Sequence, residues 1–201
     1  MKKQVLYINS NIRAGSRTAV IADAFLNALD SSRFEITELR IADLGLKPLT
    51  GDFFEERQAL LEAGKLDHRR FDYARQFAAA DLIVISAPFW DLSFPAVLKI
   101  YIENIALESV TFRSEGSGLI GICRAEKMFY FTSRGGIVPT GSEMDQGTAY
   151  LKAIASFFGI REFACAAANG MDLPDYDRCR SLADAVHEAE RMAAELNKNK
   201  I

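Results

Sequence analysis

The sequence contains few residues of the kinds that build disulfide frameworks and metal centres. Its three cysteines, Cys123, Cys165 and Cys179, are widely spaced, and none of them belongs to a C-x-x-C pair. This pattern argues against a disulfide framework and against a zinc site. The two histidines, His68 and His187, both lie among charged residues, so a catalytic cysteine has no obvious histidine partner. No metal site is therefore expected.

The sequence also lacks long hydrophobic runs and a strong excess of charge of one sign. No apolar stretch reaches the length of about 18 residues that suggests a membrane span, and no signal peptide is recognisable. Lys and Arg total 24 against 27 Asp and Glu, a net charge of −3, so there is no basic field to attract nucleic acid or an anionic membrane. We therefore expect a cytoplasmic protein that binds neither nucleic acid nor membranes.

The composition and the hydrophobic pattern predict a single α/β domain spanning residues 1–201. Hydrophobic residues make up 49% and charged residues 25%, values typical of a globular protein. Short apolar runs, typical of strands buried on both faces, alternate with segments in which apolar residues recur at helical spacing. Strands are predicted at 5–8, 34–39, 82–85, 128–132 and 162–168, and helices at 18–29, 54–63, 71–80, 95–105, 143–158 and 177–197.

This alternation predicts a five-stranded parallel sheet with helices on both faces. Right-handed crossovers leave few topologies, and five strands fit the flavodoxin-like order 2-1-3-4-5. Ligands of such sheets bind beyond the carboxyl ends of the strands, at the switch point between strands one and three. The loops at 9–18, 87–95 and 132–137 are therefore the predicted site.

The loop at 9–18 suits an anion because it runs into the start of a predicted helix. Backbone N–H groups and the helix dipole attract negative charge there, and the Ser16 and Thr18 hydroxyls can add hydrogen bonds to a phosphate. The loop has no G-x-x-x-x-G-K-[ST] pattern, which argues against a nucleoside-triphosphate site. The alternative is that Ser16 or Thr18 caps the helix without any ligand.

The other two loops offer an aromatic surface and a close backbone approach. Residues 87–95 hold the only tryptophan and two phenylalanines, which suggests cover by a flat ligand or a partner subunit, or else a hydrophobic lid folded onto its own core. Residues 132–137 hold paired glycines, and Arg134 can meet a carbonyl or a phosphate, although a tight turn is the alternative. Taken together, the three loops predict FMN as the ligand.

One glycine-rich segment is expected to have a different role. Residues 116–121 match G-x-G-x-x-G, but a dinucleotide site needs a strand before the glycines and a helix after them, and neither fits here. A flexible hairpin or flap is expected instead.

Several motifs carry a resemblance to a known family. They are Thr132–Gly136, Ala87–Leu92 followed by Leu98-Lys99, Val110–Arg113, and the pair Asn11–Arg13 and Ser16–Thr18. With these motifs the chain resembles the FMN-dependent NADH-azoreductases, which are also NADH:quinone oxidoreductases, over nearly its whole length. It departs from them at Asp91, where the family typically has Asn, and at Trp90, where it has Tyr.

The resemblance implies a role for each matching segment. The FMN phosphate would be held by Asn11, Ser16, Arg17 and Thr18. The isoalloxazine ring would be lined by Pro88, Phe89, Trp90, Asp91 and Leu92. Its other edge would be contacted by Ser133, Arg134, Gly135 and Gly136. Above the ring, the substrate pocket would be lined by Phe112, Phe157 and Phe158.

The resemblance also implies a two-electron oxidoreductase that works as a homodimer with the flavin near the subunit interface. NADH or NADPH would give hydride to flavin N5, and a quinone or azo compound would then take the electrons in a ping-pong cycle. A flavodoxin-like electron carrier without a nicotinamide site is the alternative, but the modest charge of −3 and the apolar loop favour the reductase. A protein that has lost its flavin is disfavoured because Ser16, Thr18 and the residues 133–136 are intact.

Overall fold

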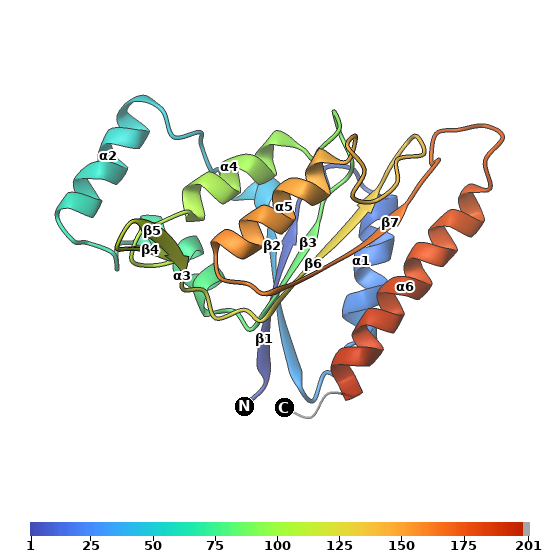
Figure 1. Cartoon of the computed structure of the whole chain (residues 1–201), viewed down its shortest axis with the longest axis horizontal. Helices are drawn as coiled ribbons and strands as arrows, with labels where there is room; N and C mark the ends of the chain where they lie inside the picture. Colours follow the sequence, from blue (N-terminus) through green and yellow to red (C-terminus); the bar gives the residue numbers. More distant parts are fainter. Residues whose placement is uncertain (199–201) are drawn as a thin grey trace.

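A five-stranded parallel sheet forms the centre of the computed structural model, which describes residues 1–198 (Figure 1). The strand order β2-β1-β3-β6-β7 confirms the predicted order 2-1-3-4-5. The strands are β1 (Lys3–Asn9), β2 (Phe34–Arg40), β3 (Leu82–Ser86), β6 (Lys127–Ser133) and β7 (Glu162–Ala168). Every residue of the central strand β3 is buried, as a parallel strand covered on both faces requires, whereas the edge strand β2 is mostly exposed.

Helices cover both faces of the sheet. Helices α1 and α6 pack on one face, and α3, α4 and α5 on the other (Figure 1). The bounds are α1 Arg17–Ala28, α2 Gly51–Glu62, α3 Asp72–Ala79, α4 Ala96–Ile105, α5 Gln146–Phe157 and α6 Arg178–Lys198, with short 3-10 helices η1 Ile41–Asp43 and η2 Arg69–Phe71. Side chains of β1 alternate between the two cores, with Val5 and Tyr7 in one and Leu6 and Ile8 in the other.

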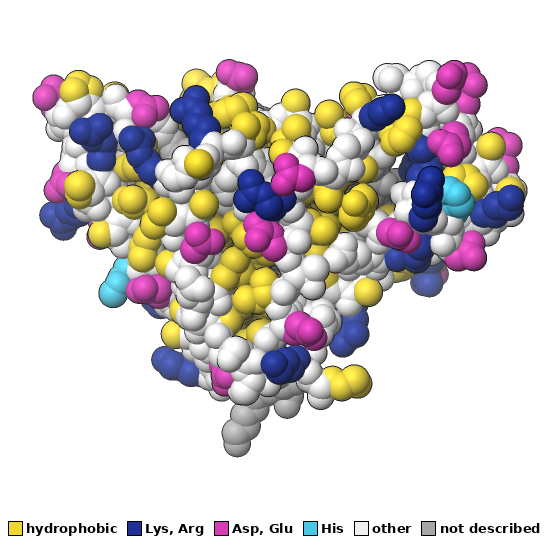
Figure 2. All heavy atoms as spheres, turned by 180° about the vertical axis from the view of Figure 1, so that it is seen from behind, with side chains coloured by type: hydrophobic (Ala, Val, Ile, Leu, Met, Phe, Trp, Pro, Cys, Tyr) yellow, Lys and Arg dark blue, Asp and Glu magenta, His cyan; other side chains and the backbone are white. Residues whose placement is uncertain are grey.

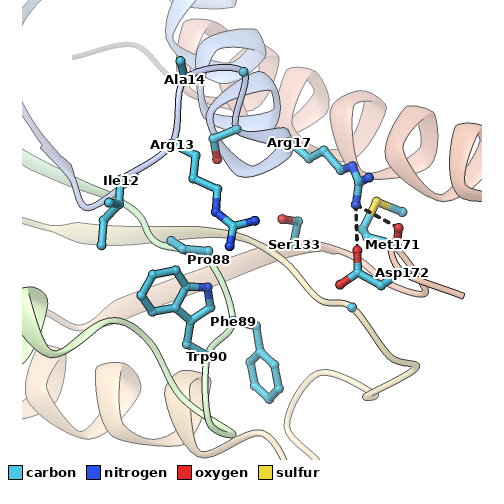
Figure 3. A pocket seen from close by; sticks show the side chains of 13 residues that line it. Ile12, Arg13, Ala14, Arg17, Pro88, Phe89, Trp90, Ser133, Met171 and Asp172 are labelled. Atoms are coloured by element: carbon cyan, nitrogen blue, oxygen red, sulfur yellow. Dashed lines mark hydrogen bonds and ion pairs between the residues drawn. The ribbon is translucent and has the colours of Figure 1, made fainter.

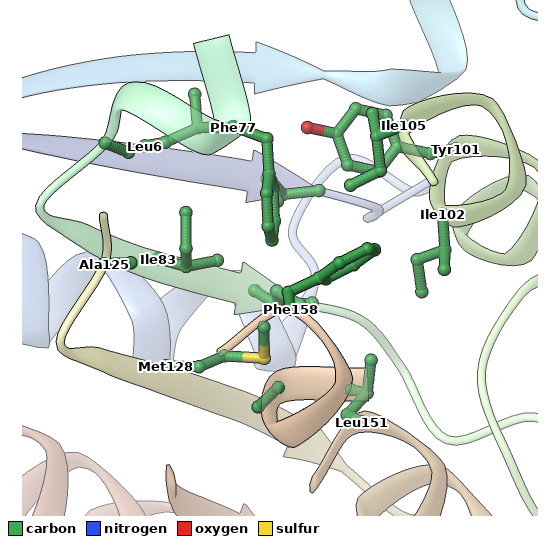
Figure 4. Close-up of a cluster of buried hydrophobic side chains, with 14 of the residues drawn as sticks. Leu6, Phe77, Ile83, Tyr101, Ile102, Ile105, Ala125, Met128, Leu151 and Phe158 are labelled. Carbon is green, nitrogen blue, oxygen red and sulfur yellow. The ribbon is translucent and has the colours of Figure 1, made fainter. Parts of the chain in front are cut away.

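The core beneath α3, α4 and α5 contains one of the residues predicted to line the substrate pocket. Phe158 is fully buried, and its ring meets that of Phe77 edge-on with the ring centroids 5.2 Å apart (Figure 4). Met128 and Leu151 belong to the same cluster. The prediction that Phe158 faces the substrate is therefore wrong, because its ring is enclosed by the core and has no surface to offer.

A two-stranded hairpin is inserted between α4 and β6, as expected for the segment 116–121. Its strands β4 (Phe112–Glu115) and β5 (Gly118–Gly121) pair antiparallel. The hairpin lies against the end of α5, where a Cβ atom on Gly121 would come within 2.0 Å of the backbone nitrogen of Gly159. Only glycine allows the two backbones to approach so closely.

Helix α2 projects from the side of the molecule (Figure 1), and none of its residues is fully buried. Two arginines attach this region to its surroundings. Arg57 Nη2 donates to the Ala106 carbonyl at 2.7 Å, and Arg70 Nη1 pairs with Glu56 Oε2 at 2.9 Å. Leu60 and Leu61 are partly buried and pack against the core, so both polar and apolar contacts hold the helix.

The surface shown in Figure 2 carries charged side chains of both signs, interspersed over its outer parts, while hydrophobic side chains gather toward the middle. This mixture agrees with the small net charge of −3. Within residues 1–198, no helix combines the length and the apolar character needed to cross a membrane.

The three cysteines differ in the environment of their thiols. Burial raises the pKa of both the Cys123 and the Cys165 thiol to about 12, whereas Cys179 is exposed. Because the thiolate is the reactive form, we expect only Cys179 to react rapidly with iodoacetamide at neutral pH. Mass spectrometry should show one modified cysteine in the folded protein and three after denaturation. Modification of Cys165 as fast as Cys179 in the folded protein would contradict the expectation.

Candidate functional site

A pocket of about 360 Å³ opens at the carboxyl edge of the sheet, where the topology predicts a ligand (Figure 3). The loops after β1, β3, β6 and β7 all contribute to it. The lining residues are Ile12, Arg13, Ala14, Gly15, Ser16, Arg17, Pro88, Phe89, Trp90, Ser133, Gly135, Met171 and Asp172. The three predicted loops therefore meet at one pocket, together with a fourth loop after β7.

The start of α1 forms the polar side of the pocket. Ser16 caps the helix by accepting a hydrogen bond from the backbone N–H of Ala19 at 3.3 Å. The cap does not exclude a ligand, because Ser16 also lines the pocket. Within residues 1–198, the backbone N–H groups of Arg17 and Thr18 have no acceptor. These donors and the positive end of the helix dipole suit an anion.

Asn11 and Thr18 form hydrogen bonds between the loops that surround the pocket. Both are buried, and neither lines the cavity. Asn11 Nδ2 donates to Asn9 Oδ1 at 2.9 Å and to Ser86 Oγ at 2.5 Å, which ties the first loop to the end of β3. Thr18 Oγ1 lies 2.7 Å from Ser133 Oγ, which ties α1 to the end of β6. These hydrogen bonds link the loop after β1 and the start of α1 to the ends of β3 and β6.

Two arginines line the pocket, and only one of them forms an ion pair within residues 1–198. Arg17 Nη1 donates to the Met171 carbonyl at 2.8 Å and pairs with Asp172 Oδ1 at 3.2 Å. Arg13 points into the pocket (Figure 3), and no carboxylate within residues 1–198 forms an ion pair with it. With Asp172 as the lining carboxylate, the two arginines leave the pocket with a positive charge. Such a lining favours a phosphate.

The aromatic side of the pocket is formed by Pro88, Phe89 and Trp90. Trp90 and Ser93 exchange backbone hydrogen bonds of 3.1 and 2.7 Å around a tight turn. The central residues Asp91 and Leu92 have positive φ angles of 48° and 65°, the geometry that favours Asn and Gly in such turns. The resemblance implied that Asp91 and Leu92 line the isoalloxazine ring. In the structure, neither residue belongs to the pocket lining.

The glycine-rich loop after β6 contributes Ser133 and Gly135 to the lining. A Cβ atom on Gly135 would lie 2.5 Å from Asp172 Oδ2, so a side chain at this position would require the exposed Asp172 carboxylate to move. The guanidinium of Arg134 is fully buried and pairs with Asp145 at 2.8 Å. The expectation that this group meets a ligand carbonyl or phosphate is not met, because it points into the protein. Gly136 lies outside the lining.

The two remaining aromatic residues predicted to contact substrate also lie outside this pocket. Phe112 on β4 and Phe157 at the end of α5 pack on each other, with ring centroids 4.9 Å apart. The structure thus brings together Ser16, Arg17, Pro88, Phe89, Trp90, Ser133 and Gly135 from the predicted set.

Comparison with known proteins agrees with the fold and the position of the pocket. Residues 3–193 match the family described by a flavodoxin-like fold. The FMN-dependent NADH:quinone oxidoreductase 2 of Clostridium acetobutylicum is 36% identical over 198 residues, covering 96% of this chain and 98% of that protein. The protein of the same name from Clostridium perfringens is 30% identical over 204 residues, covering 94% and 98%. The chain belongs to the FMN-dependent NADH:quinone oxidoreductase family.

A solved structure shows the same fold as this member of the oxidoreductase family. An FMN-dependent NADH-azoreductase from Bacillus anthracis, solved in complex with FMN, superposes with a TM-score of 0.84 over 96% of this chain and 99% of that one. Its sequence identity of 23% supports a likeness of fold.

Sequence reasoning missed six lining residues: Ile12, Arg13, Ala14, Gly15, Met171 and Asp172. Arg13 lies within the motif Asn11–Arg13 that carries the resemblance, so the sequence does hold a signal for its place in the lining. The loop after β7 could have been found from topology, because all parallel strands end at the same edge of the sheet. Within residues 1–198, no cluster of three or more His, Cys, Asp or Glu side chains could hold a metal ion.

Proposed function

We propose that this protein is an FMN-dependent NADH:quinone oxidoreductase that reduces quinones or azo compounds. The observation that carries the proposal is the pocket at the switch point, where the start of α1 faces Phe89 and Trp90. One side suits a phosphate and the other suits a flat ring, which are the two ends of FMN. The relatives that share 30 and 36% of their sequence with this chain bear the corresponding name.

The residues present fit the two ends of this cofactor. The N–H group of Arg17 and the guanidinium of Arg13 would hold the phosphate, because both residues line the pocket and these donors have no acceptor among residues 1–198. Phe89 and Trp90 would line the ring, and the Ser133–Gly135 backbone its other edge. When bound, FMN supplies the redox chemistry by accepting a hydride from NADH and passing two electrons to the acceptor.

The protein's contribution is to bind, orient and shelter the reactants. Trp90 lines the pocket and is 39% exposed, so a reactant can approach the proposed ring site from solvent beside it, and we infer that donor and acceptor use this space in turn. We therefore propose ping-pong kinetics. Initial rates measured against NADH at several quinone concentrations should give parallel double-reciprocal lines, and intersecting lines would contradict a shared space.

We further propose a homodimer in the cytoplasm. Ile12, Trp90, Leu92, Ile137 and Met144 are exposed apolar side chains in the loops at the pocket end of the sheet, and a second subunit would cover them. The three free cysteines suit a reducing compartment. A mass of one chain in sedimentation equilibrium would contradict the dimer.

The function is tested by an absorption spectrum of the purified protein. The protein with bound FMN should show absorption bands at about 370 and 450 nm. Under an oxygen-free atmosphere these bands should bleach when NADH is added and return when a quinone is added. No partner protein should be needed. Bands that persist with both NADH and NADPH would favour an electron carrier instead. A protein that takes up no FMN would contradict the proposal altogether.

A further inference from the structure

A buried ion pair lies behind the pocket without touching it. The side chains of Arg134 and Asp145 have no exposed surface, and Arg134 Nη2 lies 2.8 Å from Asp145 Oδ2. Burying two charges is costly, and replacing such a pair by hydrophobic residues is often neutral or stabilising. In addition, Arg134 Nε has no acceptor among residues 1–198. Stability alone is therefore a poor explanation for this pair.

The pair ties the glycine-rich loop to the first turn of α5. Arg134 Nη1 donates to the Val138 carbonyl at 2.5 Å and to Thr140 Oγ1 at 3.0 Å. Asp145 caps α5, since its Oδ1 accepts from the Thr148 N–H at 3.1 Å. Its Oδ2 also accepts from a backbone N–H of the same loop, that of residue 141, at 3.0 Å. One guanidinium and one carboxylate thus fix the path of residues 134–141.

Arg134 is connected to two walls of the pocket. Its sequence neighbours Ser133 and Gly135 both line the cavity. Its guanidinium carbon lies 5.5 Å from the centroid of the Phe89 ring, within the range of a cation–π contact. Phe89 in turn donates its backbone N–H to the Ser133 carbonyl at 3.1 Å. A shift of Arg134 would therefore move both the aromatic wall and the glycine-rich edge.

We propose that Arg134 is a positioning residue of the flavin site and that Asp145 balances its charge. The inference rests on the proposed function. Arg134 holds Phe89 and the residues 133–135 in place and puts a cation behind the ring site, where burial strengthens its field. Asp145 cancels most of that field. The balance of the two charges then sets the flavin potential, because a positive charge favours electron uptake and a negative charge opposes it.

The electrostatic part is tested by removing one charge at a time. In Asp145→Asn the uncompensated cation should raise the midpoint potential of bound FMN, and in Arg134→Gln the uncompensated carboxylate should lower it. A structural disturbance alone would not shift the potential in opposite directions. Shifts of the same sign, or no shift in either variant, would overturn the proposal.

A control for charge removal is available at the opposite edge of the sheet, in an ion pair whose arginine is 66% exposed and whose aspartate is 10% exposed. Arg124 Nη2 and Asp81 Oδ1 form an ion pair of 2.7 Å near the amino ends of β6 and β3. The variants Arg124→Gln and Asp81→Asn remove the same charges far from the pocket, and both should leave the potential unchanged. A shift in these variants as large as in the first two would show that location behind the pocket is irrelevant, and would also overturn the proposal.

The positioning part is tested separately with Arg134→Lys, the mildest variant and the one that should fold most readily. Lysine keeps the charge but cannot form the same set of hydrogen bonds to Val138, Thr140 and Asp145. The dissociation constant for FMN should rise about tenfold, as the loss of one or two hydrogen bonds implies, at an unchanged potential. Wild-type affinity in this variant would overturn the positioning role. Absence of FMN binding by the wild-type protein would refute the proposed function itself.

Discussion

Replacing Ser16 with aspartate is expected to weaken FMN binding by at least about 10²-fold while the protein stays folded. Aspartate is as good a helix cap as serine, so the bond from the Ala19 N–H survives. The new carboxylate would nevertheless lie at the start of α1, where we place the phosphate. Two like charges about 4 Å apart repel by about 4 kcal/mol near a protein surface, and Arg13 and Arg17 would screen part of this.

Two controls isolate the charge effect of Ser16→Asp. The variant Ser16→Asn has nearly the same shape and also caps the helix, but it adds no charge. Riboflavin lacks the phosphate, so its weaker binding should be the same in both variants. Fluorescence titration gives all four dissociation constants, and thermal unfolding checks the fold. Equal FMN affinity in the two variants would show that the phosphate does not bind at the start of α1.

The sheet was predictable because its signals are local. The run 82–85 is apolar at every position, as a strand covered on both faces requires, and it forms β3 (Leu82–Ser86). Helix ends were less predictable, because they depend on individual side chains. The helix predicted to begin at residue 143 begins at Gln146, since the Asp145 carboxylate caps it there. The position of the pocket followed from topology, before any single residue was considered.

The direction of individual side chains was not predictable, because it depends on partners distant in the sequence. Arg134 points inward because Asp145, eleven residues further on, supplies the counter-charge. No sequence pattern around Arg134 indicates that Asp145 is its partner. Asp91 and Leu92 turn out of the pocket because the chain adopts a tight turn without the Asn-Gly sequence that would have signalled it. Residues that are adjacent in these loops can therefore differ, with one side chain lining the pocket and the next pointing away from it.

The same limitation explains the wrong prediction for Phe158, whose replacement by alanine should have a large effect on stability. Phe157 and Phe158 are adjacent at the end of α5, so they point in different directions, and packing alone decides which is buried. Phe158 is fully buried against Phe77. Removing a buried phenylalanine ring costs about 3–5 kcal/mol, and in a protein of this size each kcal/mol lowers the melting temperature by about 2–4 °C.

The free energy of unfolding of Phe158→Ala is therefore expected to be about 3–5 kcal/mol lower than that of the wild type. The folded form of this variant should bind FMN as tightly as the wild type. Phe157→Ala is the matched control, because Phe157 is only half-buried and packs on Phe112, so it should lose clearly less stability. Chemical denaturation followed by circular dichroism gives the stability, and fluorescence titration gives the FMN affinity. If Phe158 faced the flavin, its loss would weaken FMN binding and leave stability nearly unchanged. The two measurements on one variant thus separate a core residue from a site residue, which the sequence alone could not do.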